Sequence, residues 1–358
     1  MPAIASCLHN VHKQDKNSSM DNPLSTAPLR SHRRIPVAGL IGTLFVIVVS
    51  VGAAAWHSSP RLTASKSGRI VVVAGENFWG SLASQLGGSR VRVISIVSDP
   101  NADAHEYESS TANARAFAAA NYVILNGAGY DDWGNKLLSA SSDSSREVLT
   151  VADLLGKHEG DNPHFWYDPD YVYKVIDRIS ADYTAIAPAD APYFHERHDA
   201  VEASFSPYRQ RLAFIKAHFA GTRVAATEGI FAYLASYTGL DVMSPPEFME
   251  ALSEGNDPPA RSVAAFEKQL ESGAPKALVY NLQTSTATTT NLKKLAAAHN
   301  IPVVGVTETS QPPAATFQEW MDAQLDALIS ALSASTSGEG TRNRVGVWGY
   351  GSMDDRPQ

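Results

Sequence analysis

The feature that most constrains the fold is a regular alternation between short apolar segments and amphipathic, helix-like segments. The apolar segments lie at residues 69–74, 91–97, 122–126, 223–226, 277–280 and 303–306. Short continuous apolar runs are typical of strands buried on both faces, and such strands occur in parallel sheets covered by helices. The sequence therefore predicts an α/β protein with two parallel sheets, one in each half of the chain.

The same pattern divides the chain into two lobes with additional segments at both ends. Residues 193–219 have helical character and many charges, and Pro207 within them is expected to kink or break a helix. We expect a long helix that connects the lobes, and 358 residues suffice for two domains with separate cores. The predicted organisation is a disordered polar segment at 1–34, an apolar segment at 35–56, a linker at 57–68, an N-terminal lobe at 69–188, a connecting helix at 189–219, a C-terminal lobe at 220–332 and a disordered tail at 333–358.

A membrane-directed segment precedes the lobes. Residues 35–56 are apolar and carry no charge, and about 20 such residues suffice to cross a bilayer as a helix. The basic residues just before them predict a cytoplasmic N-terminus, so the lobes are expected outside the cytoplasm. Small residues at 53–55 suit cleavage by a signal peptidase. A retained transmembrane anchor and a cleaved signal sequence, which would release a secreted protein, both remain open.

The composition excludes several classes of protein. The formal net charge of −8 argues against a nucleic-acid partner. Cys7 is the single cysteine, which rules out an intramolecular disulfide and a cysteine-based zinc site. Because Cys7 precedes the apolar segment, it is not the lipid-bearing cysteine of a lipoprotein.

Four metal-competent side chains lie in loops, each after an apolar run. They are His105, His164, Glu228 and Glu308. Ligands of open α/β sheets bind at the carboxyl ends of the strands, and two imidazoles with two carboxylates suit a divalent transition metal. Groups beyond these ligands should orient each imidazole, although the sequence does not identify them.

Each candidate also has an ordinary explanation when it is taken alone. His105 would be a polar loop residue or a core histidine, and His164 would pack beside the aromatic residues that follow it. Glu228 would be a carboxylate at a helix N-terminus, which the helix dipole favours. Glu308 would be an exposed turn residue. Their distribution, two in each half, favours a shared site in a cleft between the halves.

The donor types restrict the metal. Imidazole suits zinc, manganese and iron, while carboxylates neutralise the dication and add harder oxygen donors. The absence of a thiolate from the set argues against copper(I). Mn²⁺ and Zn²⁺ remain equal candidates at this point, with Fe²⁺ third.

Over about residues 69–332 the chain resembles the zinc/manganese solute-binding proteins of bacterial ABC importers, the metal-binding lipoprotein family. The matching stretches are Asn77-Phe78-Trp79, Asp103-Ala104-His105-Glu106-Tyr107-Glu108, residues 120–127, Asn162-Pro163-His164-Phe165-Trp166-Tyr167-Asp168-Pro169, residues 221–240 and residues 302–309. The resemblance implies two α/β lobes, a rigid connecting helix and one metal ion in the cleft between the lobes.

The resemblance also implies a role for each candidate. His105 and His164 would be the ligands from the N-terminal lobe. Glu228 takes the place of the third ligand, which is a histidine in many zinc binders and a glutamate in many manganese binders. Glu308 takes the place of the fourth, usually an aspartate, and whether this longer side chain binds through one or two oxygens is open. The lipobox of lipoprotein members and the histidine-rich loop of many zinc members are absent from this sequence.

We therefore expect a monomeric, extracytoplasmic receptor that captures a divalent metal and delivers it to the permease of an ABC importer. It is not expected to be an enzyme. A metallohydrolase would need three ligands, an open position and a general base, and four candidates without an H-E-x-x-H pair argue against it. A metal-dependent surface adhesin is a further alternative that the sequence does not distinguish.

Overall fold

The computed structural model describes residues 68–99 and 107–336. The predicted apolar segment 35–56, the polar segment before it and His105 lie outside the described residues, as do most of the linker and most of the tail. In the part of the chain that the structure describes, no helix is long and apolar enough to cross a membrane.

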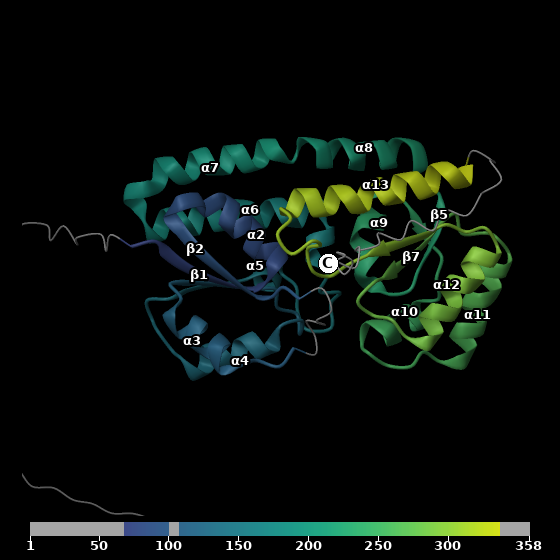
Figure 1. Cartoon of the computed structure of the whole chain (residues 1–358), viewed down its shortest axis with the longest axis horizontal. Coiled ribbons are helices and arrows are strands. Elements are labelled where there is room, and N and C mark those ends of the chain that lie inside the picture. The colour runs from purple at the N-terminus through teal and green to yellow at the C-terminus, as the bar shows by residue number, and fades with distance from the viewer. Residues whose placement is uncertain (1–67, 100–106, 337–358) are drawn as a thin grey trace, which may run out of the picture. The chain divides into compact units, whose positions relative to one another are not determined.

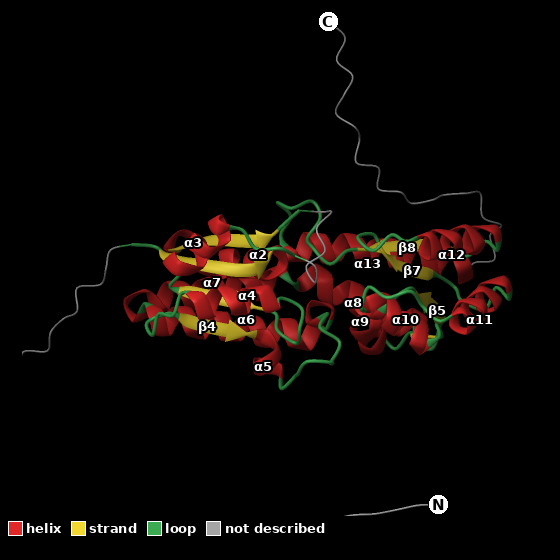
Figure 2. Ribbon diagram, turned by 90° about the horizontal axis from the view of Figure 1, so that it is seen from below, coloured by secondary structure: helices red, strands yellow, loops and turns green. Residues whose placement is uncertain are grey.

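The N-terminal lobe contains a four-stranded parallel sheet in the order β2-β1-β3-β4. Its strands are β1 (Ile70–Glu76), β2 (Val91–Val97), β3 (Tyr122–Leu125) and β4 (Glu147–Thr150). Its helices are α2 (Asn77–Gly87), α3 (Thr111–Ala119), α4 (Asp132–Ala140), α5 (Val151–Leu155) and α6 (Pro169–Ile186). The central strands β1 and β3 are almost entirely apolar because helices cover both faces of the sheet (Figure 2).

The C-terminal lobe repeats this topology in a second parallel sheet, ordered β6-β5-β7-β8. Its strands are β5 (Arg223–Ala226), β6 (Asp241–Val242), β7 (Leu278–Asn281) and β8 (Val303–Val306). Its helices are α9 (Ala232–Thr238), α10 (Pro246–Ser253), α11 (Ala260–Glu271), α12 (Ala287–Ala298) and α13 (Phe317–Thr336). In each sheet the chain order reverses between the first and third strands of the lobe, and open sheets bind ligands at such switch points. The predicted fold class is confirmed.

The connecting segment is divided into two helices, and the break expected from Pro207 is confirmed. They are α7 (Ala191–Ser204) and α8 (Ser206–Phe219), and the break falls at Phe205. Pro207 explains it, because proline lacks an N–H donor and is tolerated only in the first turn of a helix. In Figure 1 α8 runs beside α13, and Arg211 of α8 pairs with Asp326 of α13 through two contacts of 2.8 Å.

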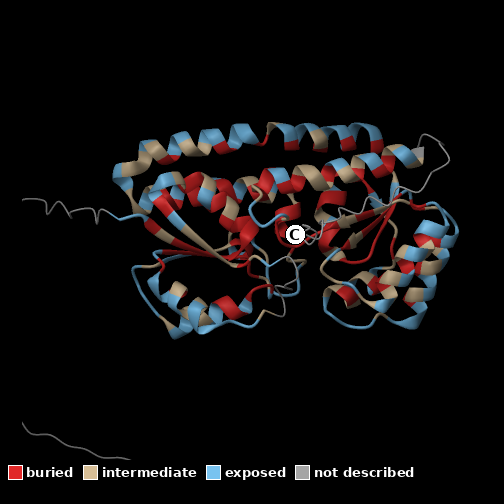
Figure 3. Cartoon of the chain, in the orientation of Figure 1, coloured by how far each residue is buried: buried red, intermediate tan, exposed pale blue. Residues whose placement is uncertain are grey.

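An aromatic cluster joins the two lobes. Phe78 of α2 stacks on Trp166, with ring centroids 4.2 Å apart, and lies 6.3 Å from Trp320 of α13. Tyr167 contacts Trp320 at 6.2 Å, and Phe317 contacts it at 5.8 Å. These side chains are buried, and Figure 3 shows buried segments where α2 and the start of α13 meet. One hydrophobic core therefore extends over both lobes, beside a smaller one within the C-terminal lobe, and it restricts how far the lobes can move apart.

Some elements differ from the prediction. A proline pair such as Pro245-Pro246 favours a loop when only the sequence is considered, but Pro246 begins α10, where the missing N–H is not needed. The short helices α4 and α5 were also not predicted. Tertiary packing stabilises such short helices, because a helix of this length is marginal on its own.

Candidate metal site

His164 is held in a defined tautomer at the start of a 3-10 helix, Phe165–Tyr167. Asn162 donates from Nδ2 to the carbonyl oxygen of Gly229 at 2.7 Å, so its Oδ1 must face the imidazole, 2.6 Å from His164 Nδ1. An amide oxygen only accepts, and Nδ1 therefore carries the proton. In the neutral ring the lone pair then belongs to Nε2, which is the form of imidazole that binds a metal.

Asn162 also connects the two lobes. Gly229 directly follows Glu228 in the C-terminal lobe, and Tyr233 of the same lobe donates to the carbonyl oxygen of Asn162 at 2.9 Å. One asparagine thus orients His164 and contacts the backbone beside Glu228. It belongs to a motif noted in the sequence, but the sequence did not indicate this role.

Glu308 follows β8 and is buried, which contradicts the explanation that it is an exposed turn residue. Asn281 Nδ2 donates to its Oε1 at 2.7 Å, and the Tyr130 hydroxyl donates to its Oε2 at 2.9 Å. Its backbone N–H donates to Gln283 Oε1 at 2.6 Å. Both lobes therefore contact the carboxylate, Tyr130 from the N-terminal lobe and Asn281 from the C-terminal lobe.

The structure brings His164 and Glu308 together. His164 Nε2 lies 3.9 Å from Glu308 Oε1, and both side chains are almost fully buried. One ion can reach both atoms, because two metal–ligand bonds of about 2.1 Å span up to about 4.2 Å. The Nε2 lone pair and the carboxylate oxygen thus form two neighbouring donors in a site shielded from water.

Glu228 follows β5 and is also buried. Its side chain makes no capping hydrogen bond to the helical turn Gly229–Phe231, which argues against the explanation as a helix N-terminal carboxylate. Burial raises the pKa of the Tyr167 hydroxyl well above its usual range, and the charges of Glu308 and Glu228 raise it further. Both carboxylates therefore lie close enough to Tyr167 to affect the same hydroxyl.

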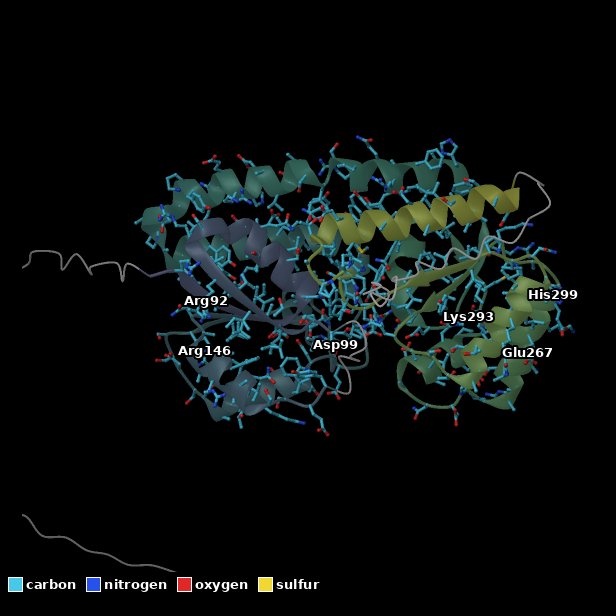
Figure 4. The ribbon with its side chains drawn as sticks, viewed as in Figure 1. Arg92, Asp99, Arg146, Glu267, Lys293 and His299 are labelled. Carbon is cyan, nitrogen blue, oxygen red and sulfur yellow. The ribbon has the colours of Figure 1, made fainter. Side chains whose placement is uncertain are left out.

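The structure describes three of the four predicted ligands, His164, Glu228 and Glu308. His105 lies between Asp99 and Tyr107, outside the described residues; Figure 4 shows Asp99 near the carboxyl end of β2 and Arg92 near its amino end. Within residues 68–99 and 107–336, no group of three or more His, Cys, Asp and Glu side chains is arranged to hold a metal ion. The described residues thus supply the His164–Glu308 pair, with Glu228 nearby.

A second pair of carboxyl groups lies beside the site and was not predicted. Glu76, the last residue of β1, is fully buried, and Asp131 accepts the backbone N–H groups of Asn126 and Gly127 at 2.7 and 2.8 Å. Burial raises the pKa of Asp131 to about 6. Burial, and then the charge of Asp131, raises the pKa of Glu76 well above its usual range, and Glu308 contributes in the same direction. Gly75 of β1 leaves room for the Asp131 side chain, because a Cβ at position 75 would lie 2.8 Å from Asp131 Oδ2.

Asn281, Glu76 and Tyr130 belong to the site but were not identified from the sequence. Only Asn281 and Glu76 occur in a sequence pattern that points to a binding site. Each is a polar residue at the carboxyl end of an apolar strand, the place where ligands of open sheets bind. Tyr130 carried none, since nothing in its local sequence indicates a contact with Glu308 in the other lobe.

Solved structures with the same fold define the class of this molecule. The chain aligns with the Mn-bound S38A mutant of a periplasmic metal binding protein from Candidatus Liberibacter asiaticus at a TM-score of 0.64 and 18% identity, over 74% of this chain and 100% of that chain. It aligns with the periplasmic zinc binding protein TroA from Treponema pallidum at a TM-score of 0.62 and 15% identity, over 74% of this chain and 99% of that one. These matches establish a shared two-lobed α/β fold.

The sequence identifies the family within that class. Residues 72–331 match the family described as "Zinc-uptake complex component A periplasmic", ZnuA, and the chain belongs to this family. The predicted resemblance to the metal-binding proteins of ABC importers is therefore confirmed.

Three curated relatives align with part of the chain. The iron-binding protein YfeA of Yersinia pestis is 26% identical over 205 residues, which cover 54% of this chain and 64% of YfeA. The manganese-binding lipoprotein MntA of Halalkalibacterium halodurans is 29% identical over 154 residues, 42% of this chain and 51% of MntA. The manganese ABC transporter substrate-binding lipoprotein PsaA of Streptococcus mitis is 24% identical over 169 residues, 44% of this chain and 54% of PsaA. The chain thus spans between 51% and 64% of the length of these relatives.

Proposed function

We propose that this protein is the substrate-binding component of an ABC importer, which captures a divalent metal ion between its lobes and delivers it to the permease. The observation that carries the proposal is the His164–Glu308 pair, with Nε2 and Oε1 3.9 Å apart and the imidazole tautomer set for metal binding. The proposed ligands are His105, His164, Glu228 and Glu308. His105 and Glu228 are included because their motifs resemble those of the family.

The relatives support a receptor rather than an enzyme, because their names describe metal binding and transport. They also support the metals considered, since the names include iron, manganese and, for TroA, zinc. We propose Mn²⁺ or Zn²⁺ as cargo, with Fe²⁺ third. A monomer suffices, because one chain supplies all four proposed ligands.

The proposed location is outside the cytoplasm. Residues 35–56 would hold the protein at the membrane, or their cleavage would release it. Attachment through a peptide segment rather than a lipid would distinguish it from the lipoproteins MntA and PsaA, because Cys7 precedes the apolar segment.

Metal binding by the full chain, purified in detergent and stripped with a chelator, tests the proposal. We expect one equivalent of Zn²⁺ or Mn²⁺ to bind and to raise the melting temperature, because a ligand that binds only the folded state stabilises it. His164→Ala and Glu308→Ala should abolish most of this shift.

Matched controls come from the periphery of the C-terminal lobe. His299 is exposed at the end of α12 and Glu267 lies on α11, and Figure 4 shows both on the outer side of that lobe. His299→Ala and Glu267→Ala should retain full binding and the full shift. Binding that is equally strong in all four variants, or absent from the unmodified chain, would refute the proposed site.

A further inference from the structure

We propose that Tyr130 and Asn281 restrict Glu308 to a single metal-binding oxygen, Oε1, and thereby make the site prefer zinc to manganese. This inference rests on the proposed function, and it names the cargo that the same site selects. It follows from how each oxygen of the carboxylate is held.

The two oxygens of Glu308 have different surroundings. Oε1 lies 3.9 Å from His164 Nε2 and accepts the Asn281 amide at 2.7 Å, so it is the oxygen that faces the imidazole. Oε2 accepts the Tyr130 hydroxyl at 2.9 Å. Binding through both oxygens requires the carboxylate to turn until both face the ion equally. That rotation would stretch or break the bond to Tyr130.

Tyr130 cannot readily follow such a rotation. Its ring is buried and packs against Trp166 and His164, with centroids 5.2 and 6.2 Å away. Its backbone N–H donates to Gly127 at 3.1 Å, closing a loop in which Gly127, Ala128 and Gly129 all have positive φ. Ala128 adopts this conformation at a cost for a non-glycine residue, which indicates that the surrounding structure holds the loop in place.

Asn281 is equally constrained. It is fully buried, its Oδ1 accepts the backbone N–H of Gln283 at 3.0 Å, and its Nδ2 also donates to Thr284 at 3.1 Å. The amide can therefore present only its N–H groups to Glu308. Both donors are fixed before a metal arrives, one from each lobe.

A carboxylate that offers one oxygen favours zinc. Zinc binds in tetrahedral sites of nitrogen and oxygen donors, whereas manganese prefers octahedral, oxygen-rich coordination. A second oxygen from Glu308 would raise the coordination number towards the one that manganese prefers. Tyr130 opposes this change, so its hydroxyl acts on specificity without touching the metal.

The test compares Tyr130→Phe with Tyr167→Phe in the full chain. Tyr167 is a matched control, because its buried hydroxyl donates to the backbone oxygen of Thr307 and to Gln324, next to Glu308 but not to its carboxylate. Competition titrations with Zn²⁺ and Mn²⁺ give the ratio of the two affinities. Because the carboxylate can then turn towards the metal, we expect the zinc-to-manganese ratio to fall about tenfold in Tyr130→Phe, which corresponds to about 1.4 kcal/mol. The ratio should not change in Tyr167→Phe.

X-ray absorption at the zinc edge provides a readout that a merely structural role would not alter. The average number of oxygen and nitrogen neighbours should rise in Tyr130→Phe and stay constant in Tyr167→Phe. If Tyr130→Phe does not fold, Asn281→Ala should shift the ratio in the same direction, because it also frees the carboxylate to turn.

The outcomes separate this inference from the proposed function. If the unmodified chain binds neither metal, the proposed function fails and this inference fails with it. If the chain binds metal but both tyrosine variants keep its affinity ratio, or change it equally, only the inference is refuted.

Discussion

Asn162 is the residue whose replacement gives the sharpest test of how the site is built. In Asn162→Ala, His164 loses the acceptor that fixes its tautomer and ring orientation, a contact of 2.6 Å. The C-terminal lobe loses the donor to the carbonyl oxygen of Gly229, a contact of 2.7 Å. Metal affinity and stability should therefore both fall, for separable reasons.

The expected magnitudes follow from these two contacts. Removing a group that orients a metal-binding histidine weakens metal affinity by about 10–100-fold, which corresponds to about 1.4–2.7 kcal/mol. Each lost hydrogen bond contributes about 1 kcal/mol, and the polar atoms left buried add to the cost. The free energy of unfolding should thus fall by about 2–3 kcal/mol.

Asn162→Asp separates the two effects. Aspartate keeps an acceptor for His164 Nδ1 but lacks the donor to Gly229, so this variant should lose stability and retain metal affinity. Asn121→Ala is the matched control. Its Oδ1 accepts the backbone N–H of Val71 at 2.9 Å at the amino ends of β1 and β3, the ends opposite the site.

Isothermal titration with zinc and urea unfolding of the metal-free protein measure the two quantities. Asn121→Ala should lose stability and keep its metal affinity. Wild-type zinc affinity in Asn162→Ala would refute the reasoning, because it would mean that His164 needs no orientation by Asn162 or is not a ligand.

Three further predictions concern the metal preference, the pH dependence and the core. Glu228→His should raise the affinity for zinc relative to manganese, because nitrogen replaces a harder oxygen; unchanged relative affinities in competition titrations would argue against Glu228 as a ligand. The pKa of Asp131, raised by burial from 3.8 to about 6, means that the folded state holds a proton that the unfolded state releases. Through Asp131 alone, stability should therefore fall by about 2 kcal/mol as the pH rises from 4 to about 7. Asp131→Asn should remove this contribution to the slope in urea unfolding, while Glu76, whose pKa burial also raises, keeps its own, and an unaltered slope would contradict the assignment. Trp320→Ala should lower the free energy of unfolding by about 3–5 kcal/mol, since it leaves a cavity in the aromatic cluster between the lobes. A loss below about 1 kcal/mol in urea unfolding would show that the lobes do not share a core.

Elements with a local signal could be predicted from the sequence. Helix α6 is one of them: Asp168 caps its N-terminus, and its apolar residues recur at the spacing of an amphipathic helix. By contrast, α10 was missed because a proline pair resembles a turn, although proline is well suited to the first position of a helix.

The site was predictable only as a set of loops. His164 and Glu308 were singled out because each occurs in a matching motif, and the structure places the two side chains together. Their surroundings were not predictable. The Tyr130–Glu308 bond joins residues far apart in the chain, and no local pattern marks either as the partner of the other.

The sequence by itself determined the two parallel sheets and the loops at their carboxyl ends. It could do so because burial on both faces of a strand leaves a continuous apolar run that is visible locally. Only the tertiary structure decided which tautomer His164 adopts, which oxygen of Glu308 faces it and how deeply both are buried. The tautomer depends on Asn162, which its bond to Gly229 orients, and the orientation of Glu308 depends on the bond from Tyr130. Both bonds join the lobes, so they and the burial of the site form only after the lobes have packed together.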